Sequence, residues 1–182
     1  MSATHLIFFF FNSPPEQTLT ADARRLITPE EFRSGVVPYT DPRLIQYLAE
    51  NPREVYALSP YKFQEVVGEL LRRHGYPDIR VGPKGADGGV DLFAERLTEL
   101  GRELVLVACK RNREDRKVGE PIVKQLAYEV NEREATRGLI VTTSTFTEDA
   151  LKLIEEKRYK LSGKDFDHFQ RWVRQARERF GQ

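Results

Sequence analysis

Two charged residues, Asp91 and Lys110, lie at the ends of predicted strands. Asp91 follows a glycine-rich turn over residues 82–89, and Lys110 ends an apolar stretch over 103–109. If the two strands are neighbours in one sheet, both side chains meet at one end of it. A carboxylate there can hold a hard divalent cation, and a lysine can stabilise charge on a phosphate. Such a pair can serve phosphodiester hydrolysis, but by itself the spacing is a weak signal, because a charged residue at a strand end is more often an ordinary surface residue.

The segment from Lys110 to Lys117 carries five basic residues against Glu114 and Asp115. Such a run is more often a solvated loop. Its position next to the Asp91–Lys110 pair raises the expectation that it meets nucleic-acid phosphates. The net charge of the whole chain is only +1 and gives no independent argument for nucleic acid.

The apolar periodicity after residue 57 predicts an α/β domain. A helix is expected between the cap at Ser59-Pro60 and Gly75. Ser162 and Asp165 have capping-box spacing and predict the start of the last helix. Between them we expect strands around 79–81 and over 90–94, 103–109 and 138–143, with helices over 122–130 and 147–157. This order implies a mixed sheet flanked by helices, in which the third strand is central and buried on both faces.

Residues 1–57 are interpreted as a small accessory segment, and residues 58–182 as the main domain. The apolar run His5–Asn12 favours a strand packed on the main domain or on a partner subunit. Thr28 and Asp41 each precede a proline, which predicts two short helices.

Composition excludes several classes of protein. Apolar residues make up 40% and charged residues 31% of the 182, an ordinary globular balance. The single cysteine, Cys109, excludes an internal disulfide and fits a reducing cytoplasm, and with three histidines it cannot form a zinc cluster. The longest apolar run is far shorter than the roughly 20 residues that cross a membrane. We therefore expect a cytoplasmic protein with no membrane partner.

From Ser59 to about Val173, several motifs in order resemble the Mrr-type restriction endonuclease domain of the PD-(D/E)xK nuclease superfamily. The fold implied is a restriction-endonuclease-like core with a mixed central sheet, preceded here by the accessory segment. The matching stretches are Phe63-Gln-Glu65, Gly85-Ala-Asp-Gly-Gly-Val-Asp91, Cys109-Lys-Arg111, Val123-Lys-Gln-Leu126 and Gly138-Leu-Ile-Val-Thr-Thr-Ser144.

The resemblance implies roles for individual residues. Asp91 would be the metal-binding carboxylate, the carbonyl of Cys109 a further metal ligand and Lys110 the catalytic lysine. Gln125 would face the active site or a phosphate. Glu65 or Gln64 would complete the metal shell, although the family usually has an acidic residue at the Gln64 position. The basic side chains expected to meet DNA are Lys84, Arg111, Arg113, Lys117 and Lys124.

Ala108 departs from the family pattern, which has Glu or Gln two residues before the lysine as the second metal ligand. A methyl group cannot bind a cation, so we expect this copy to be inactivated at Ala108. The alanine fits either a natural member that binds DNA without cutting or an engineered inactivation. The intact Asp91 and Lys110 favour engineering.

The function implied is a Mg²⁺-dependent DNA endonuclease of the restriction or defence type, with Mn²⁺ as a possible substitute. Its partners would be double-stranded DNA and either a second copy or a larger defence complex, since two sites cut opposite strands most simply. The alternatives are a catalytically dead nucleic-acid-binding module and an interaction subunit of a defence complex.

Overall fold

A computed structural model describes residues 26–35, 37–38, 41–82 and 89–180 of the chain. The strand expected over His5–Asn12, the phosphate contact expected from Lys84 and most of the glycine-rich turn lie outside these residues. In the described part of the chain, none of the helices is both long and apolar enough to cross a membrane.

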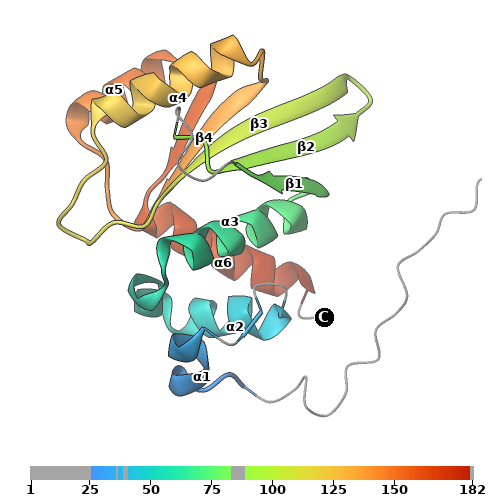
Figure 1. Cartoon of the computed structure of the whole chain (residues 1–182), viewed down its shortest axis with the longest axis vertical. Coiled ribbons are helices and arrows are strands. Elements are labelled where there is room, and N and C mark those ends of the chain that lie inside the picture. Colours follow the sequence, from blue (N-terminus) through green and yellow to red (C-terminus); the bar gives the residue numbers. More distant parts are fainter. Residues whose placement is uncertain (1–25, 36, 39–40, 83–88, 181–182) are drawn as a thin grey trace, which may run out of the picture.

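One five-stranded mixed sheet forms the centre of the fold (Figure 1). Its strands lie in sequence order: β1 (Asp78–Val81), β2 (Leu92–Thr98), β3 (Gly101–Lys110), β4 (Arg137–Thr142) and β5 (Leu161–Lys164). The first three are antiparallel, whereas β3, β4 and β5 run parallel. This confirms the expected mixed sheet with a central third strand.

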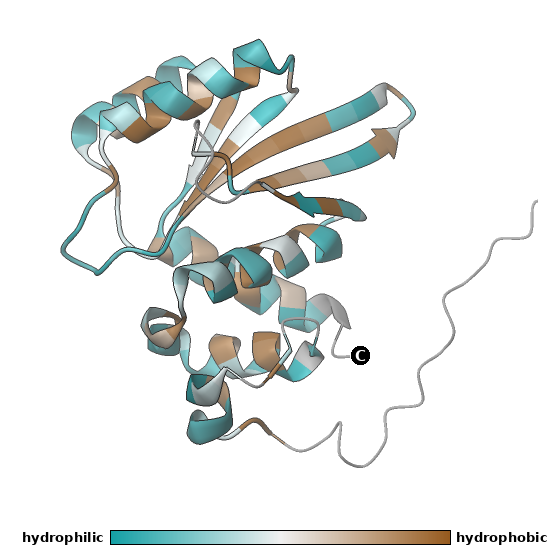
Figure 2. Cartoon of the chain, in the orientation of Figure 1, coloured by the Kyte–Doolittle hydropathy of each residue, from teal (hydrophilic) through white to brown (hydrophobic). Residues whose placement is uncertain are grey.

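Helices cover both faces of the sheet (Figure 1). Helices α4 (Glu120–Glu132) and α5 (Glu148–Glu156) pack on one face, and α3 (Pro60–Arg73) and α6 (Phe166–Phe180) on the other. Figure 2 shows hydrophobic residues concentrated along the middle of β3. Along this strand the side chains alternate between the two cores: Leu106 and Ala108 face α4, while Val107 and Cys109 face α3 and α6.

The N-terminal helices lie on the side of α6 away from the sheet (Figure 1). They are α1 (Pro29–Ser34), α2 (Pro42–Glu50) and the 3-10 helix η2 (Pro52–Ala57). Thr28 and Asp41 cap α1 and α2 through their side chains, as expected from the sequence. Leu44, Ile45 and Val55 are buried in the same core cluster as α3 and α6. Within the described residues, this part of the accessory segment therefore shares a core with the main domain.

The sequence prediction was wrong at the start of the last helix. Ser162 lies inside β5, and α6 begins at Phe166. The Asp165 carboxylate caps it by accepting the His168 N–H at 2.9 Å. Strand β5 has only four residues and contains Gly163, so its sequence carries little strand signal; its pairing with β4 determines it.

We predict that Ile45→Ala lowers the free energy of unfolding by about 2–5 kcal/mol, because it leaves a cavity in the shared core. Urea denaturation followed by fluorescence and by circular dichroism is expected to give one transition, shifted as a whole. Gln46→Ala on the same helix is the control and should change stability little. A separate early transition for Ile45→Ala would instead show that the N-terminal helices unfold independently of the rest of the domain.

Candidate active site

Asp91 is fixed at one end of the sheet by its backbone and its side chain. Its N–H donates to the Val107 carbonyl at 2.8 Å, and its own carbonyl accepts the Gly82 N–H at the same distance. Since Leu92 pairs with Val107, Asp91 lies level with Ala108 on β3. The carboxylate Oδ2 accepts the Cys109 N–H at 2.7 Å. The carboxylate therefore joins the start of β2 to the end of β3.

The residue of α3 that reaches Asp91 is Gln64. Its Nε2 donates to Asp91 Oδ1 at 2.7 Å. The Glu65 carboxylate instead pairs with Lys62 Nζ at 3.3 Å and is partly exposed. Of the two α3 side chains suggested by the sequence, the fold brings Gln64 and not Glu65 to Asp91.

Gln125 approaches from the opposite side, on α4. A β-carbon built on Gly89 would lie 3.3 Å from Gln125 Oε1. Gly89 also has a φ of +64°, which favours glycine. The turn before Asp91 therefore takes a conformation suited to glycine and leaves space for the Gln125 amide, two residues from the carboxylate.

Lys110 ends β3 next to Asp91. Its carbonyl accepts three hydrogen bonds, from Thr142 Oγ1, the Asn112 N–H and the Thr143 N–H. No described residue forms a hydrogen bond or ion pair with its Nζ, and the side chain is half-buried. The backbone at this strand end is thus held rigidly, and the ammonium remains able to meet an anion.

The hydroxyl groups at the end of β4 form hydrogen bonds with backbone groups. Thr142, Thr143 and Ser144 are fully buried, and Thr143 Oγ1 donates to the Asn112 carbonyl at 2.6 Å. Tyr56 Oη of η2 donates to the Thr143 carbonyl at 2.8 Å, a contact that no feature of the sequence indicated. The hydroxyls of Thr142 and Thr143 therefore connect the end of β4 to the backbone at and just after Lys110, the end of β3.

Burial shifts the pKa of two groups at this end of the sheet, the Asp91 carboxyl and the Cys109 thiol. Burial raises the pKa of the Asp91 carboxyl, while the hydrogen bond from Cys109 N–H and the charge of Lys110 oppose the rise. Burial also raises the pKa of the Cys109 thiol well above its usual range. The thiol is 8% exposed and stays protonated, as expected for a core cysteine.

The basic residues near the site differ in solvent exposure and in their partners. Arg113 and Lys117 are exposed in the loop between β3 and α4, which bows out beyond the end of the sheet (Figure 1). Lys124 is exposed on α4 and paired with Glu120. Arg111 is half-buried: its Nη1 donates to the Tyr56 carbonyl at 3.4 Å, and its buried Nε has no partner among the described residues. Arg111 is therefore packed against η2 rather than extended towards solvent.

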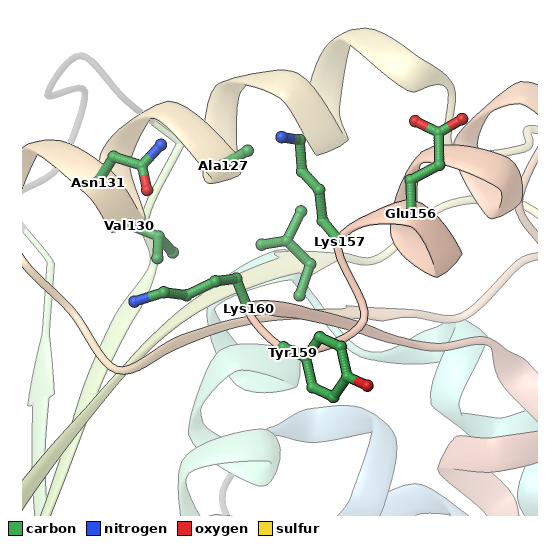
Figure 3. A pocket seen from close by; sticks show the side chains of 8 residues that line it. Ala127, Val130, Asn131, Glu156, Lys157, Tyr159 and Lys160 are labelled. Carbon is green, nitrogen blue, oxygen red and sulfur yellow. The ribbon is translucent and has the colours of Figure 1, made fainter.

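A separate hollow of about 210 Å³ lies between α4, the end of α5 and the start of β5 (Figure 3). Leu161, which lines it, pairs with Gly138 near the beginning of β4, whereas Lys110 pairs with Thr142 at its end. The hollow is thus at the opposite end of the sheet, and none of the predicted site residues lines it.

The residues at the site do not form a complete cation site. In the described ranges, no group of three or more His, Cys, Asp or Glu side chains could hold a metal ion. Ala108 presents a methyl group that is 1% exposed, and both oxygens of Asp91 accept protein N–H groups. A divalent ion needs several oxygen ligands, and one carboxylate supplies too few.

Asp91 lies just before β2 and Lys110 ends β3, so the mixed sheet brings the two residues to the same end. Residues 55–173 match the family model Mrr_cat, described as restriction endonuclease. The chain belongs to this family.

Similar proteins are restriction enzymes. The type IV methyl-directed restriction enzyme EcoKMrr of Escherichia coli (strain K12) is 38% identical over 98 residues, 51% of this chain and 31% of that protein. The DNA modification-dependent restriction endonuclease AspBHI has a TM-score of 0.57 at 21% identity, over 84% of this chain and 40% of its own. The MspJI restriction endonuclease, in complex with a 27-mer oligonucleotide, has a TM-score of 0.51 at 16% identity, over 84% and 33%. The chain thus spans less than half the length of each, and the two structures support the fold alone.

We predict that Asp91→Asn changes the pH dependence of stability. Because the folded protein holds the Asp91 proton more tightly than the unfolded chain, the carboxyl's contribution to stability falls as pH rises through its raised pKa. The free energy of unfolding of the unaltered chain, relative to Asp91→Asn, should therefore be higher at acidic than at neutral pH. Urea titrations across this range measure it. A difference that grows towards neutral pH would contradict the burial of this carboxyl.

Proposed function

We propose that the chain carries the DNA-binding and phosphodiester-hydrolysing apparatus of a divalent-metal-dependent endonuclease, inactivated at Ala108. The observation that carries the proposal is the buried methyl of Ala108, level with Asp91 and on the same side of β3 as Lys110. An acidic side chain here would extend towards the Asp91 carboxylate. Two carboxylates at that point would give a hard cation such as Mg²⁺, or Mn²⁺ in its place, the oxygen ligands it needs.

Lys110 has the charge and position to assist hydrolysis. Its ammonium would lie beside a phosphate bound at the Asp91 end of the sheet and stabilise the negative charge that develops on it. The Gln125 amide, on the α4 side, can donate to a phosphate oxygen or orient a water. Cys109 would contribute its carbonyl, while Glu65, paired with Lys62, is a weaker candidate for a direct role.

Duplex DNA is the proposed partner. The loop over residues 111–117 brings Arg113 and Lys117 to the surface beside this end of the sheet. AspBHI and MspJI, which share the fold, are restriction endonucleases, and MspJI is described in complex with an oligonucleotide. Because two copies of the site cut the two strands most simply, we propose a second copy or a larger defence complex as a further partner.

The second candidate function is DNA binding without cleavage. It is favoured by the two N–H donors on the Asp91 carboxylate, which satisfy it without a cation. The experiments below separate the two.

We expect Ala108→Glu to gain plasmid cleavage in Mg²⁺ or Mn²⁺, from no detectable activity to a rate at least 100-fold above background, since a missing transition-state interaction typically changes the rate by about 10²–10³. The double variant Ala108→Glu/Lys110→Ala should lose that gain, and addition of EDTA should abolish it. The measurement is conversion of supercoiled plasmid to nicked and linear forms.

Circular dichroism must show that Ala108→Glu folds, because the substitution places a carboxylate at a fully buried position. A folded Ala108→Glu variant that binds duplex DNA and cuts in neither metal would sink the nuclease assignment in favour of the binding module. Cleavage by the unaltered chain would show that Ala108 is no inactivation.

The affinity for duplex DNA should fall with salt, with a slope that reports the phosphates contacted. We expect Lys117→Ala to weaken binding for all sequences and to reduce the slope by about one. Lys157→Ala, in the hollow at the far end of the sheet (Figure 3), is the matched control and should leave the slope unchanged. Fluorescence anisotropy at several salt concentrations measures both. Equal effects of the two variants would contradict a DNA face at the β3–α4 loop.

A further inference from the structure

The Gln64 amide donates a hydrogen bond to one of the two Asp91 oxygens that a cation could bind. Gln64 Nε2 lies 2.7 Å from Asp91 Oδ1, and the Cys109 N–H lies at the same distance from Oδ2. Because an ionised carboxylate only accepts hydrogen bonds, the Gln64 atom that faces it is the amide nitrogen. Both carboxylate oxygens thus have protein donors.

An amide nitrogen cannot serve as a ligand of a hard cation, which binds oxygen. Each carboxylate oxygen has two lone pairs, so a cation at Oδ1 competes with the Gln64 amide for that oxygen. Gln64 itself becomes a ligand only if the amide turns so that Oε1 faces the ion, and this breaks a hydrogen bond to a charged group, which is among the stronger hydrogen bonds in proteins.

The packing of α3 keeps Gln64 close to Asp91. Phe63, Val66 and Val67, around Gln64, are completely buried against the sheet and α6, so the helix cannot move away without opening the core, and only rotation of the Gln64 side chain can break the hydrogen bond. A glutamate at position 64 would place two carboxylates together, which repel each other unless a cation or a shared proton lies between them. Glutamine at the same place forms a pair that needs none.

We propose that Gln64 is a second residue, with Ala108, that weakens the binding of divalent cations at this site, because its amide nitrogen competes for Asp91 Oδ1 and supplies no ligand. The inference rests on the proposed function, since it concerns the same site. Asp91 then joins α3 to the ends of β2 and β3. Replacing Ala108 alone supplies a ligand but leaves the Gln64 amide in competition for Asp91.

Mn²⁺ binding, followed by electron paramagnetic resonance, tests the proposal without a cleavage assay. The set comprises Ala108→Glu alone and combined with Gln64→Ala, Gln64→Glu or Gln46→Ala. The control Gln46 likewise donates to a carboxylate, that of Glu50, but on α2 and away from the site.

Removal of the Gln64 amide should raise Mn²⁺ affinity about three- to tenfold over Ala108→Glu alone, because the hydrogen bond that competes for Asp91 Oδ1 is lost. Gln64→Glu should raise it further, and Gln46→Ala should not change it. If Gln64→Ala lowers the affinity or leaves it unchanged, Gln64 is a ligand or a bystander and the proposal is overturned.

A double-mutant cycle in the unaltered chain provides a second test. Gln64→Ala, Asp91→Ala and the combined variant are compared by urea denaturation. The two residues should be coupled by about tenfold or more in the equilibrium constant for unfolding, as expected for a hydrogen bond to a charged group. Additive effects of the two substitutions would overturn the proposed pairing.

Failure of this inference and failure of the proposed function give different results. If Ala108→Glu cuts DNA and Gln64→Ala adds no Mn²⁺ affinity, the proposed function stands and this inference fails. If Gln64→Ala raises Mn²⁺ affinity and none of the variants cuts DNA, this inference stands and the nuclease proposal fails.

Discussion

The hydrogen bond from the Cys109 N–H to the Asp91 carboxylate determines the geometry of the whole site. It joins the start of β2 to the end of β3 at the point where the regular pairing of the two strands ends. The strand register sets Asp91 level with Ala108, and the hydrogen bond holds the carboxylate at the strand end that carries Lys110. Helices on opposite faces of the sheet then each contribute one amide, Gln64 from α3 and Gln125 from α4.

The alternation of side chains along β3 explains why the proposed inactivation depends on one position. Ala108 and Lys110 lie on the same side of the strand, whereas Val107 and Cys109 face the other core. The side chains of the two neighbours of Ala108 therefore cannot take the place of the proposed ligand. Ala108 is itself fully buried, so the fold accommodates the alanine without a gap at the surface.

The N-terminal helices act on the site indirectly. Tyr56 of η2 donates to the Thr143 carbonyl and accepts from Arg111, so it contacts the chain just after β4 and just after Lys110. Since η2 and α2 share the core of α3 and α6, the segment supports the same helix that carries Gln64. Its boundary at residue 57 marks a change in the sequence pattern, while the core continues across it.

The sequence by itself determined the elements with strong local signals. Caps with prolines marked α1, α2 and α3, apolar runs marked β3 and β4, and Asp91 and Lys110 at the ends of predicted strands indicated the candidate site. It did not determine β5, which has four residues and forms by pairing with β4. Nor did it separate Gln64 from Glu65, because neighbouring helical residues differ by about 100° in direction and only the packing of α3 decides which one meets Asp91. Local sequence sets the elements, and long-range packing decides which side chains come together.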